Sequence, residues 1–102
     1  MQLKTGARLH SVVCDTEVIV IKTPDTDLDL RCGGEPMVAQ SDPTRLADSP
    51  EKGQDGGSPT GKRYADDDLG LEVLVTKGGA GTLALGDEVL PTKAPKRLPS
   101  SD

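Results

Sequence analysis

Short runs of β-branched and aliphatic residues, separated by turn-forming residues, follow one another along most of the chain. None of these runs has the helical period of about 3.6 residues. Residues 12–21 read V-V-C-D-T-E-V-I-V-I, and this density of β-branched side chains predicts a strand. Shorter runs of the same kind predict further strands at 28–31, 36–38, 71–77, 82–85 and 88–90. The pattern therefore predicts an all-β protein.

Two stretches depart from this pattern. Residues 41–58 are rich in Ser, Gly and Pro, and Leu46 is their only large aliphatic residue. Such a stretch buries too little apolar surface to offset its chain entropy, so we expect a flexible linker or long loop. Residues 91–102 carry three prolines and end in S-S-D, which predicts an extended tail.

A shift of 55 residues aligns the first half of the chain with the second. The shared pattern is T-G-x-R, which is not a strand pattern, then E-V-x-V-x-K, then L-x-L. The identical positions in the first half are Thr5, Gly6, Arg8, Glu17, Val18, Val20, Lys22, Leu28 and Leu30. Self-similarity of this kind indicates one supersecondary unit used twice. The alternative is that two unrelated β-meanders use the same common residues.

We therefore divide a single domain into a first β repeat at 3–40, the linker at 41–58, a second β repeat at 59–90 and the tail at 91–102. A unit of three short strands cannot bury its apolar face alone, but two units packed about a pseudo-two-fold axis can. The predicted fold is a small barrel or two packed sheets, built from two pseudo-symmetric three-strand halves. Strands 17–22 and 72–77 should hold equivalent central positions. One core should contain Val18, Val20, Leu28, Leu30, Val73, Val75, Leu83 and Leu85.

Charge and aromatic content narrow the functional classes. The 102-residue chain has a net charge of −5, one Tyr and no Phe or Trp. We exclude nucleic-acid binding, because phosphate neutralisation needs basic residues and base stacking needs aromatic ones. No apolar run reaches about 18 residues, so no membrane-spanning segment is expected. The first residues lack the apolar region of a secretory signal, which predicts a cytoplasmic protein.

Two arginines recur in the repeat, Arg8 and Arg63, and so do Glu17 and Glu72. Guanidinium groups grip carboxylates and phosphates in a fork, so Arg8 and Arg63 together could bind a small anionic ligand. The favoured alternative is an Arg–Glu ion pair within each repeat, because that explains why both residue types recur together.

His10, Cys14 and Cys32 carry the donor atoms that zinc prefers, but no C-x-x-C pair accompanies them. Cys14 lies within the predicted strand 12–21 and is expected to be a buried core residue. Cys32 precedes Gly33-Gly34 at a strand end, so we expect it to be the more exposed, reactive thiol. His10 is the only histidine in the sequence, so it is the only imidazole that could activate the Cys32 thiol as a base. No cofactor is predicted.

Several phrases of the sequence, V-C-D-T-E-V-I-V, L-R-C-G-G-E-P-M, G-L-E-V-L-V-T-K and the ending L-P-S-S-D, resemble a family of small, uncharacterised bacterial proteins. The resemblance covers both halves but not the linker. It implies a bacterial, cytoplasmic setting and no particular activity.

These observations favour a small non-enzymatic binding or accessory protein. Its thin aliphatic core could be supported by a protein partner or a homodimer. The alternatives are a thiol or zinc-binding protein that uses His10, Cys14 and Cys32, and a binder of small anions that uses Arg8 and Arg63.

Overall fold

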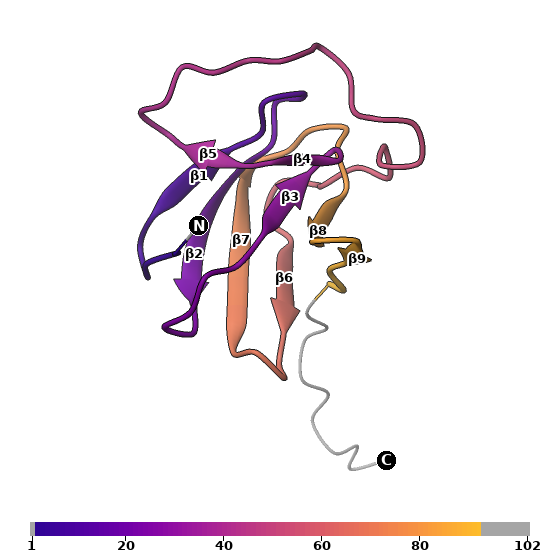
Figure 1. Ribbon diagram of the computed structural model, residues 1–102. Helices are drawn as coiled ribbons and strands as arrows, with labels where there is room; N and C mark the ends of the chain where they lie inside the picture. The colour runs from indigo at the N-terminus through magenta and orange to yellow at the C-terminus, as the bar shows by residue number, and fades with distance from the viewer. Residues whose placement is uncertain (1, 93–102) are drawn as a thin grey trace, which may run out of the picture.

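The computed structural model describes residues 2–92. Nine strands in this range form two antiparallel sheets that pack together, as Figure 1 shows. The five-stranded sheet has the order β5-β1-β2-β7-β6 and consists of β1 (Arg8–His10), β2 (Glu17–Lys22), β5 (Val38–Ala39), β6 (Arg63–Asp66) and β7 (Leu71–Lys77). The four-stranded sheet has the order β4-β3-β8-β9 and consists of β3 (Leu30–Cys32), β4 (Glu35–Pro36), β8 (Leu83–Leu85) and β9 (Glu88–Val89).

The predicted all-β class is confirmed, and of its two forms the packed sheets are observed rather than a closed barrel. Within residues 2–92 there is no helix, and therefore none long and apolar enough to cross a membrane. The predicted tail at 91–102 lies outside the described residues, apart from Pro91 and Thr92.

The core lies between the sheets and follows from the two-residue period of the strands. In β2 the side chains of Val18 and Val20 are buried while those of Ile19 and Ile21 are only partly covered. Leu71, Val73 and Val75 bury the same face of β7. Leu30 and Leu83 enter the same cluster from the opposite sheet, and Leu28 and Leu85 pack against it partly buried. The predicted single aliphatic core is confirmed.

The register of the strands relates the two halves. β2 and β7 are neighbours in the middle of the larger sheet, and Ile19 lies opposite Leu74, the residue 55 positions further along. Arg8 pairs with Ile19 in β1–β2, and Arg63 pairs with Leu74 in β6–β7. In the smaller sheet Leu30 pairs with Leu85, again 55 positions apart. The two halves are thus arranged pseudo-symmetrically, and each contributes strands to both sheets.

The Thr-Gly parts of the T-G-x-R segments form turns, and the strands that follow them, β1 and β6, were not among the predicted strands. Their glycines make equivalent turns, with φ of 87° at Gly6 and 86° at Gly61, a region that favours glycine. Gly6 N donates to Val20 O at 2.7 Å and Gly61 N to Val75 O at 2.8 Å. These bonds begin the pairing of β1 with β2 and of β6 with β7. The arginines of the two segments are the first residues of β1 and β6.

Residues 12–16 were predicted to be part of a strand but form a loop. Ser11 Oγ accepts hydrogen bonds from Val13 N at 3.1 Å and Cys14 N at 3.2 Å, so a side chain replaces a strand partner. Ser11 N donates to Thr16 O at 2.9 Å and closes the loop. The structure confirms that the apolar residues at 12–14 are buried, but they do not pair with a neighbouring strand.

A long segment, residues 40–57, connects the halves, and we call it the strap. It leaves β5 and crosses one end of the sandwich before it returns to β6 (Figure 1). Its backbone is attached at several points: Leu46 N donates to Val12 O at 2.7 Å, Glu51 N to Gly33 O at 2.9 Å and Gly57 N to Ala80 O at 2.9 Å. The flexibility expected of residues 41–58 stays a prediction.

Candidate functional site: a buried dithiol beside a polar pocket

The two cysteines lie together under the strap. Cys14 comes from the loop after β1 and Cys32 from the end of β3, and their sulfur atoms are 3.7 Å apart. Both thiols are free and buried, with 6% of Cys14 and 0% of Cys32 exposed. The burial of Cys14 is as predicted. The prediction that Cys32 is the more exposed thiol is wrong, because Cys32 alternates inward with Leu30 in β3.

Gly81, in the loop between β7 and β8, packs directly on both sulfur atoms. A Cβ at this position would lie 2.8 Å from Cys32 Sγ, 2.9 Å from Cys14 Sγ and 2.9 Å from Gly33 N. The absence of a side chain at Gly81 therefore gives the two sulfur atoms the space that they share.

Three buried hydroxyl groups surround the dithiol. Cys14 Sγ donates to Thr16 Oγ1 at 3.3 Å, Thr16 Oγ1 and Ser58 Oγ are 2.6 Å apart, and Ser58 Oγ donates to Gly81 O at 2.9 Å. Because Ser58 donates its proton to the carbonyl oxygen of Gly81, Thr16 donates to Ser58 while it accepts from the protonated thiol, and its rotatable hydroxyl group can donate to the sulfur atom once Cys14 ionises. This chain connects the loop of Cys14 and Thr16 to two segments that are distant in sequence. Ser11, in the loop itself, adds the third hydroxyl group.

The environment distinguishes the two thiols. Burial raises the pKa of Cys14, but hydrogen bonds with Ser11, Thr16 and the backbone outweigh this effect and bring its pKa below the usual value. Burial, together with the neighbouring Cys14, raises the pKa of Cys32 to about 12. Since the thiolate is the nucleophilic form, these surroundings favour Cys14 over Cys32 as a nucleophile.

A polar pocket of about 320 Å³ lies beside Cys14. It is lined by His10, Ser11, Cys14, Asp15, Glu17, Gln40, Arg45 and Lys77. The strap supplies Gln40 and Arg45, and Arg45 Nη1 donates to Cys14 O at 2.8 Å. Cys32 is not among the lining residues, so Cys14 is the cysteine that borders the pocket.

His10 does not complete a metal site. Its Nδ1 lies 2.9 Å from Ser11 O and its Nε2 lies 2.5 Å from Asp42 O, so both ring nitrogens are engaged with backbone carbonyl oxygens. Within residues 2–92 no group of three or more His, Cys, Asp or Glu side chains is placed to hold a metal ion. The structure brings together two of the three expected zinc ligands, Cys14 and Cys32, and turns the third toward the strap.

Arg8 and Arg63 do not form a common site. They lie in β1 and β6, with β2 and β7 between them, which places their backbones about 14 Å apart. Arg63 Nη1 pairs with Glu72 Oε2 at 3.2 Å, the ion pair expected within the second half. In the described part of the chain Arg8 has no ion pair, and Glu17 instead accepts a hydrogen bond from Gln40 at 3.4 Å. The two-arginine anion clamp is thus not assembled.

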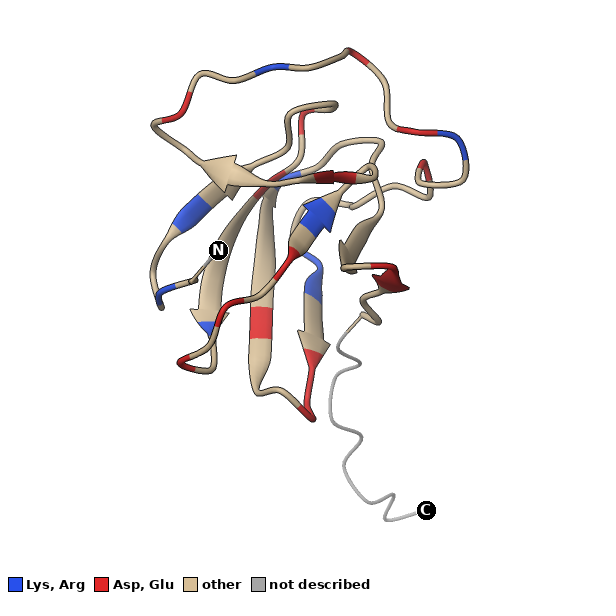
Figure 2. Ribbon diagram, in the orientation of Figure 1, with Lys and Arg blue, Asp and Glu red and all other residues tan. Residues whose placement is uncertain are grey.

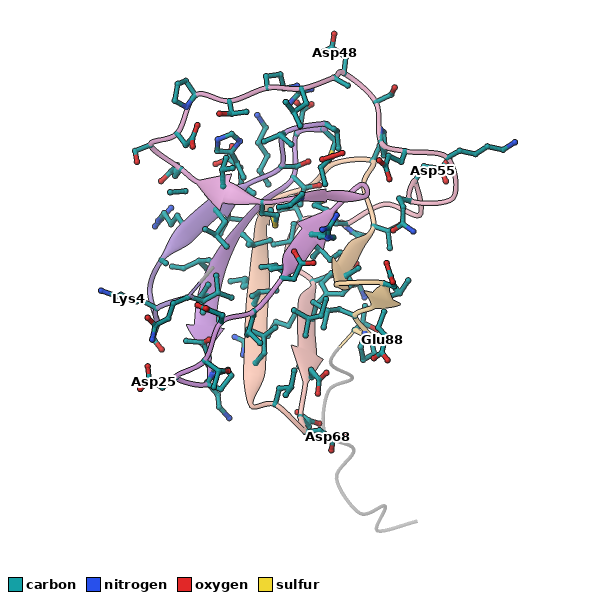
Figure 3. All side chains as sticks on the ribbon, viewed as in Figure 1. Lys4, Asp25, Asp48, Asp55, Asp68 and Glu88 are labelled. Atoms are coloured by element: carbon teal, nitrogen blue, oxygen red, sulfur yellow. The ribbon has the colours of Figure 1, made fainter. Side chains whose placement is uncertain are left out.

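Charged side chains elsewhere are dispersed. Lys and Arg are scattered over several strands and the strap, and Asp and Glu occur both along the strap and at the turns opposite to it (Figure 2). Asp25 and Asp68 lie at the turns, and Asp48 lies on the strap at the other end (Figure 3).

Sequence reasoning did not identify Thr16, Ser58, Arg45 or Gly81 as parts of the site. Ser58 belongs to the polar stretch predicted as linker, yet it is 1% exposed. Nothing in the local sequence indicates that these residues meet, because they come from three different connections, β1–β2, β5–β6 and β7–β8.

No family model, curated protein or solved structure matches this chain. The dithiol and its pocket are therefore the features that indicate a function.

Proposed function

We propose that this is a small, non-enzymatic thiol protein of the cytoplasm, in which Cys14 and Cys32 change reversibly between dithiol and disulfide. The observation that carries the proposal is the 3.7 Å contact of two free, buried sulfur atoms with unequal acidity. A disulfide bond is about 2.05 Å long, so the sulfur atoms must approach by about 1.7 Å.

The loop that carries Cys14 can supply this movement more readily than β3 can. Residues 11–16 take no part in either sheet, whereas Cys32 is fixed by pairing with Leu83 in β8 and Glu35 in β4. The oxidant we propose is a small disulfide. Cys14 as thiolate attacks one of its sulfur atoms and releases a thiolate. Cys32 then attacks Cys14 Sγ and releases the second one, and the two thiol protons pass to the products.

A binding or accessory role is part of the same proposal. The pocket beside Cys14 can take a ligand, and exposed aliphatic side chains at Leu46 and Val89 could contact a protein partner or a second copy. We also propose that the two halves arose by duplication in a bacterial ancestor. This is supported by the equivalent registers of β1–β2 and β6–β7 and by the nine identities.

The test is oxidation of the purified, reduced protein with bis(2-hydroxyethyl) disulfide, followed by thiol titration under denaturing conditions and intact mass measurement. We expect the loss of both thiols and of two hydrogen atoms from a monomer, with full reversal by a dithiol reductant. The Cys32→Ser variant should stop at a mixed disulfide on Cys14. Two thiols that persist in the oxidised wild type, or disulfides only between molecules, would contradict the proposal.

The zinc alternative gives a different result in the same preparation. Stoichiometric zinc that is retained through gel filtration, and that is lost in the His10→Asn variant, would favour a metal site over a redox dithiol.

A further inference from the structure

We infer that the pocket beside Cys14 binds a low-molecular-weight disulfide that carries both ammonium and carboxylate groups, such as a disulfide of an amino-acid thiol. This deepens the proposed function and rests on it, since the ligand is the oxidant of the dithiol.

The pocket lies next to one of the two cysteines. Cys14 lines it and Cys32 does not, and Cys14 is also the thiol with the lower pKa. A disulfide in the pocket therefore lies beside the residue whose thiol ionises first, and the loop at 11–16, which takes no part in either sheet, can move to bring the sulfur atoms together. Cys32 then lies 3.7 Å behind Cys14, where it can resolve the mixed disulfide without itself contacting the ligand.

A second feature of the pocket is its charge. Glu17 and Lys77 lie opposite each other in the register of β2 and β7. In a second pair of the lining, Arg45 Nη1 lies 4.0 Å from Asp15 Oδ1, while Arg45 Nη2 also lies 3.5 Å from the exposed Asp48 Oδ1. Glu17, Lys77, Arg45 and Asp15 all line the pocket, so each of the two pairs presents one positive and one negative group. A ligand of a single charge would meet repulsion at both pairs, whereas a zwitterion can interact with groups of both signs.

A third feature is its size. The strap contributes Gln40 and Arg45 to the lining, and Arg45 is held to the backbone of Cys14 by a 2.8 Å hydrogen bond. The volume of about 320 Å³ suits a small molecule.

The reaction is balanced without another reagent. Cys14 thiolate forms a bond to one ligand sulfur as the S–S bond of the ligand breaks, and one thiolate leaves. Cys32 loses its proton and forms a bond to Cys14 Sγ, and the second ligand thiolate leaves. The protein loses two hydrogen atoms, and the ligand gains them as two thiols.

The test measures mixed-disulfide formation on the Cys32→Ser variant with four probes. These are cystine (zwitterionic), bis(2-hydroxyethyl) disulfide (neutral), cystamine (dicationic) and 3,3′-dithiodipropionate (dianionic). Each rate constant is divided by that of the same probe with N-acetylcysteine, which removes the intrinsic reactivity of the probe. We expect cystine to be favoured by about fivefold over the other three, the size that two partly exposed ion pairs can supply.

The lysine of the pocket has a matched control in the same sheet. Lys22 lies opposite Glu72 as Lys77 lies opposite Glu17, but Lys22 is not part of the pocket. Lys77→Met should remove most of the preference for cystine and Lys22→Met should keep it. Equal normalised rates for all probes would overturn the inference, while the proposed function would stand if the wild type still closes its disulfide with the neutral probe.

A second measurement does not depend on the Cys32→Ser variant. Lanthionine, the unreactive thioether analogue of cystine, is titrated into reduced wild-type protein and followed by amide chemical shifts. Shifts at residues 10–17 and 40–45 that saturate would support the inference, and their absence at millimolar ligand would overturn it. Failure of the wild type to form a Cys14–Cys32 disulfide with any probe would overturn the proposed function as well.

Discussion

Replacing Gly81 by alanine tests whether the two sulfur atoms occupy the space that this glycine leaves. The added Cβ would lie 2.8 Å from Cys32 Sγ and 2.9 Å from Cys14 Sγ, well inside the usual contact distance of carbon and sulfur. It would also lie 2.9 Å from Gly33 N, which donates to Thr82 O at 3.0 Å. All three neighbours must therefore move.

The expected cost follows from two opposing terms. Overpacking of a well-packed core costs about 1–3 kcal/mol. Alanine restricts the unfolded chain more than glycine does, which offsets about 0.4–1 kcal/mol. We expect a net loss of roughly 1–2 kcal/mol in the free energy of unfolding, because the first term is larger. In a domain of this size that lowers Tm by roughly 5–10 °C.

The assay is urea unfolding of the reduced protein, repeated in a Cys14→Ala/Cys32→Ala background. Removal of both sulfur atoms removes two of the three closest contacts and leaves the one with Gly33 N, so Gly81→Ala should cost less than half as much there. An equal cost in both backgrounds would refute the reasoning, because the sulfur atoms would then not be what the new side chain meets.

Three further outcomes are expected. Thr16→Val removes a hydrogen bond that lowers the pKa of Cys14, so alkylation of Cys14 near pH 8 should be slower than in the wild type and in Thr16→Ser; equal rates would contradict the role of the hydroxyl group. Val18→Ala and Val73→Ala should each lower the free energy of unfolding by about 2 kcal/mol or more, and by nearly the same amount, since the two valines are buried at equivalent positions. Urea midpoints that differ strongly between the two variants would count against the pseudo-symmetry. Burial raises the pKa of Cys32 from 9.0 to about 12 in the folded protein, so the stability that its protonated thiol contributes is complete below pH 9 and is lost as the pH rises through 12. The reduced wild type should therefore lose stability over this range relative to Cys32→Ala. Parallel pH profiles of the two proteins would contradict the burial of the thiol.

The alternation of the chain predicts the β class, the central pair of strands and the core, because period-two burial is a local property. Val18, Val20, Val73 and Val75 reach the core for this reason. The same reasoning fails where burial comes without extended pairing. Residues 12–16 are apolar enough for a strand, but the hydroxyl group of Ser11 binds their backbone and holds a loop.

The dithiol could not be predicted, because its geometry depends on distant segments. Cys14 and Cys32 are 18 residues apart, and their contact requires the loop after β1 to fold over the end of β3. Cys32 precedes two glycines, a local signal for an exposed turn. Its burial comes from its inward position in β3 and from Gly81, which packs on its sulfur atom from the second half of the chain. Sequence alone indicates neither approach.

The pairing of β2 with β7 also determines the order in which the chain can fold. Ile19 meets a partner 55 residues away, whereas Arg63 and Leu74 are only 11 residues apart. The hairpins β1–β2 and β6–β7 can form locally, but neither sheet is complete until both halves are present. During synthesis the inner edge of β2 therefore remains unpaired until the ribosome has released β7. For that interval the central strand of the native protein is an exposed strand edge, open to pairing with other chains.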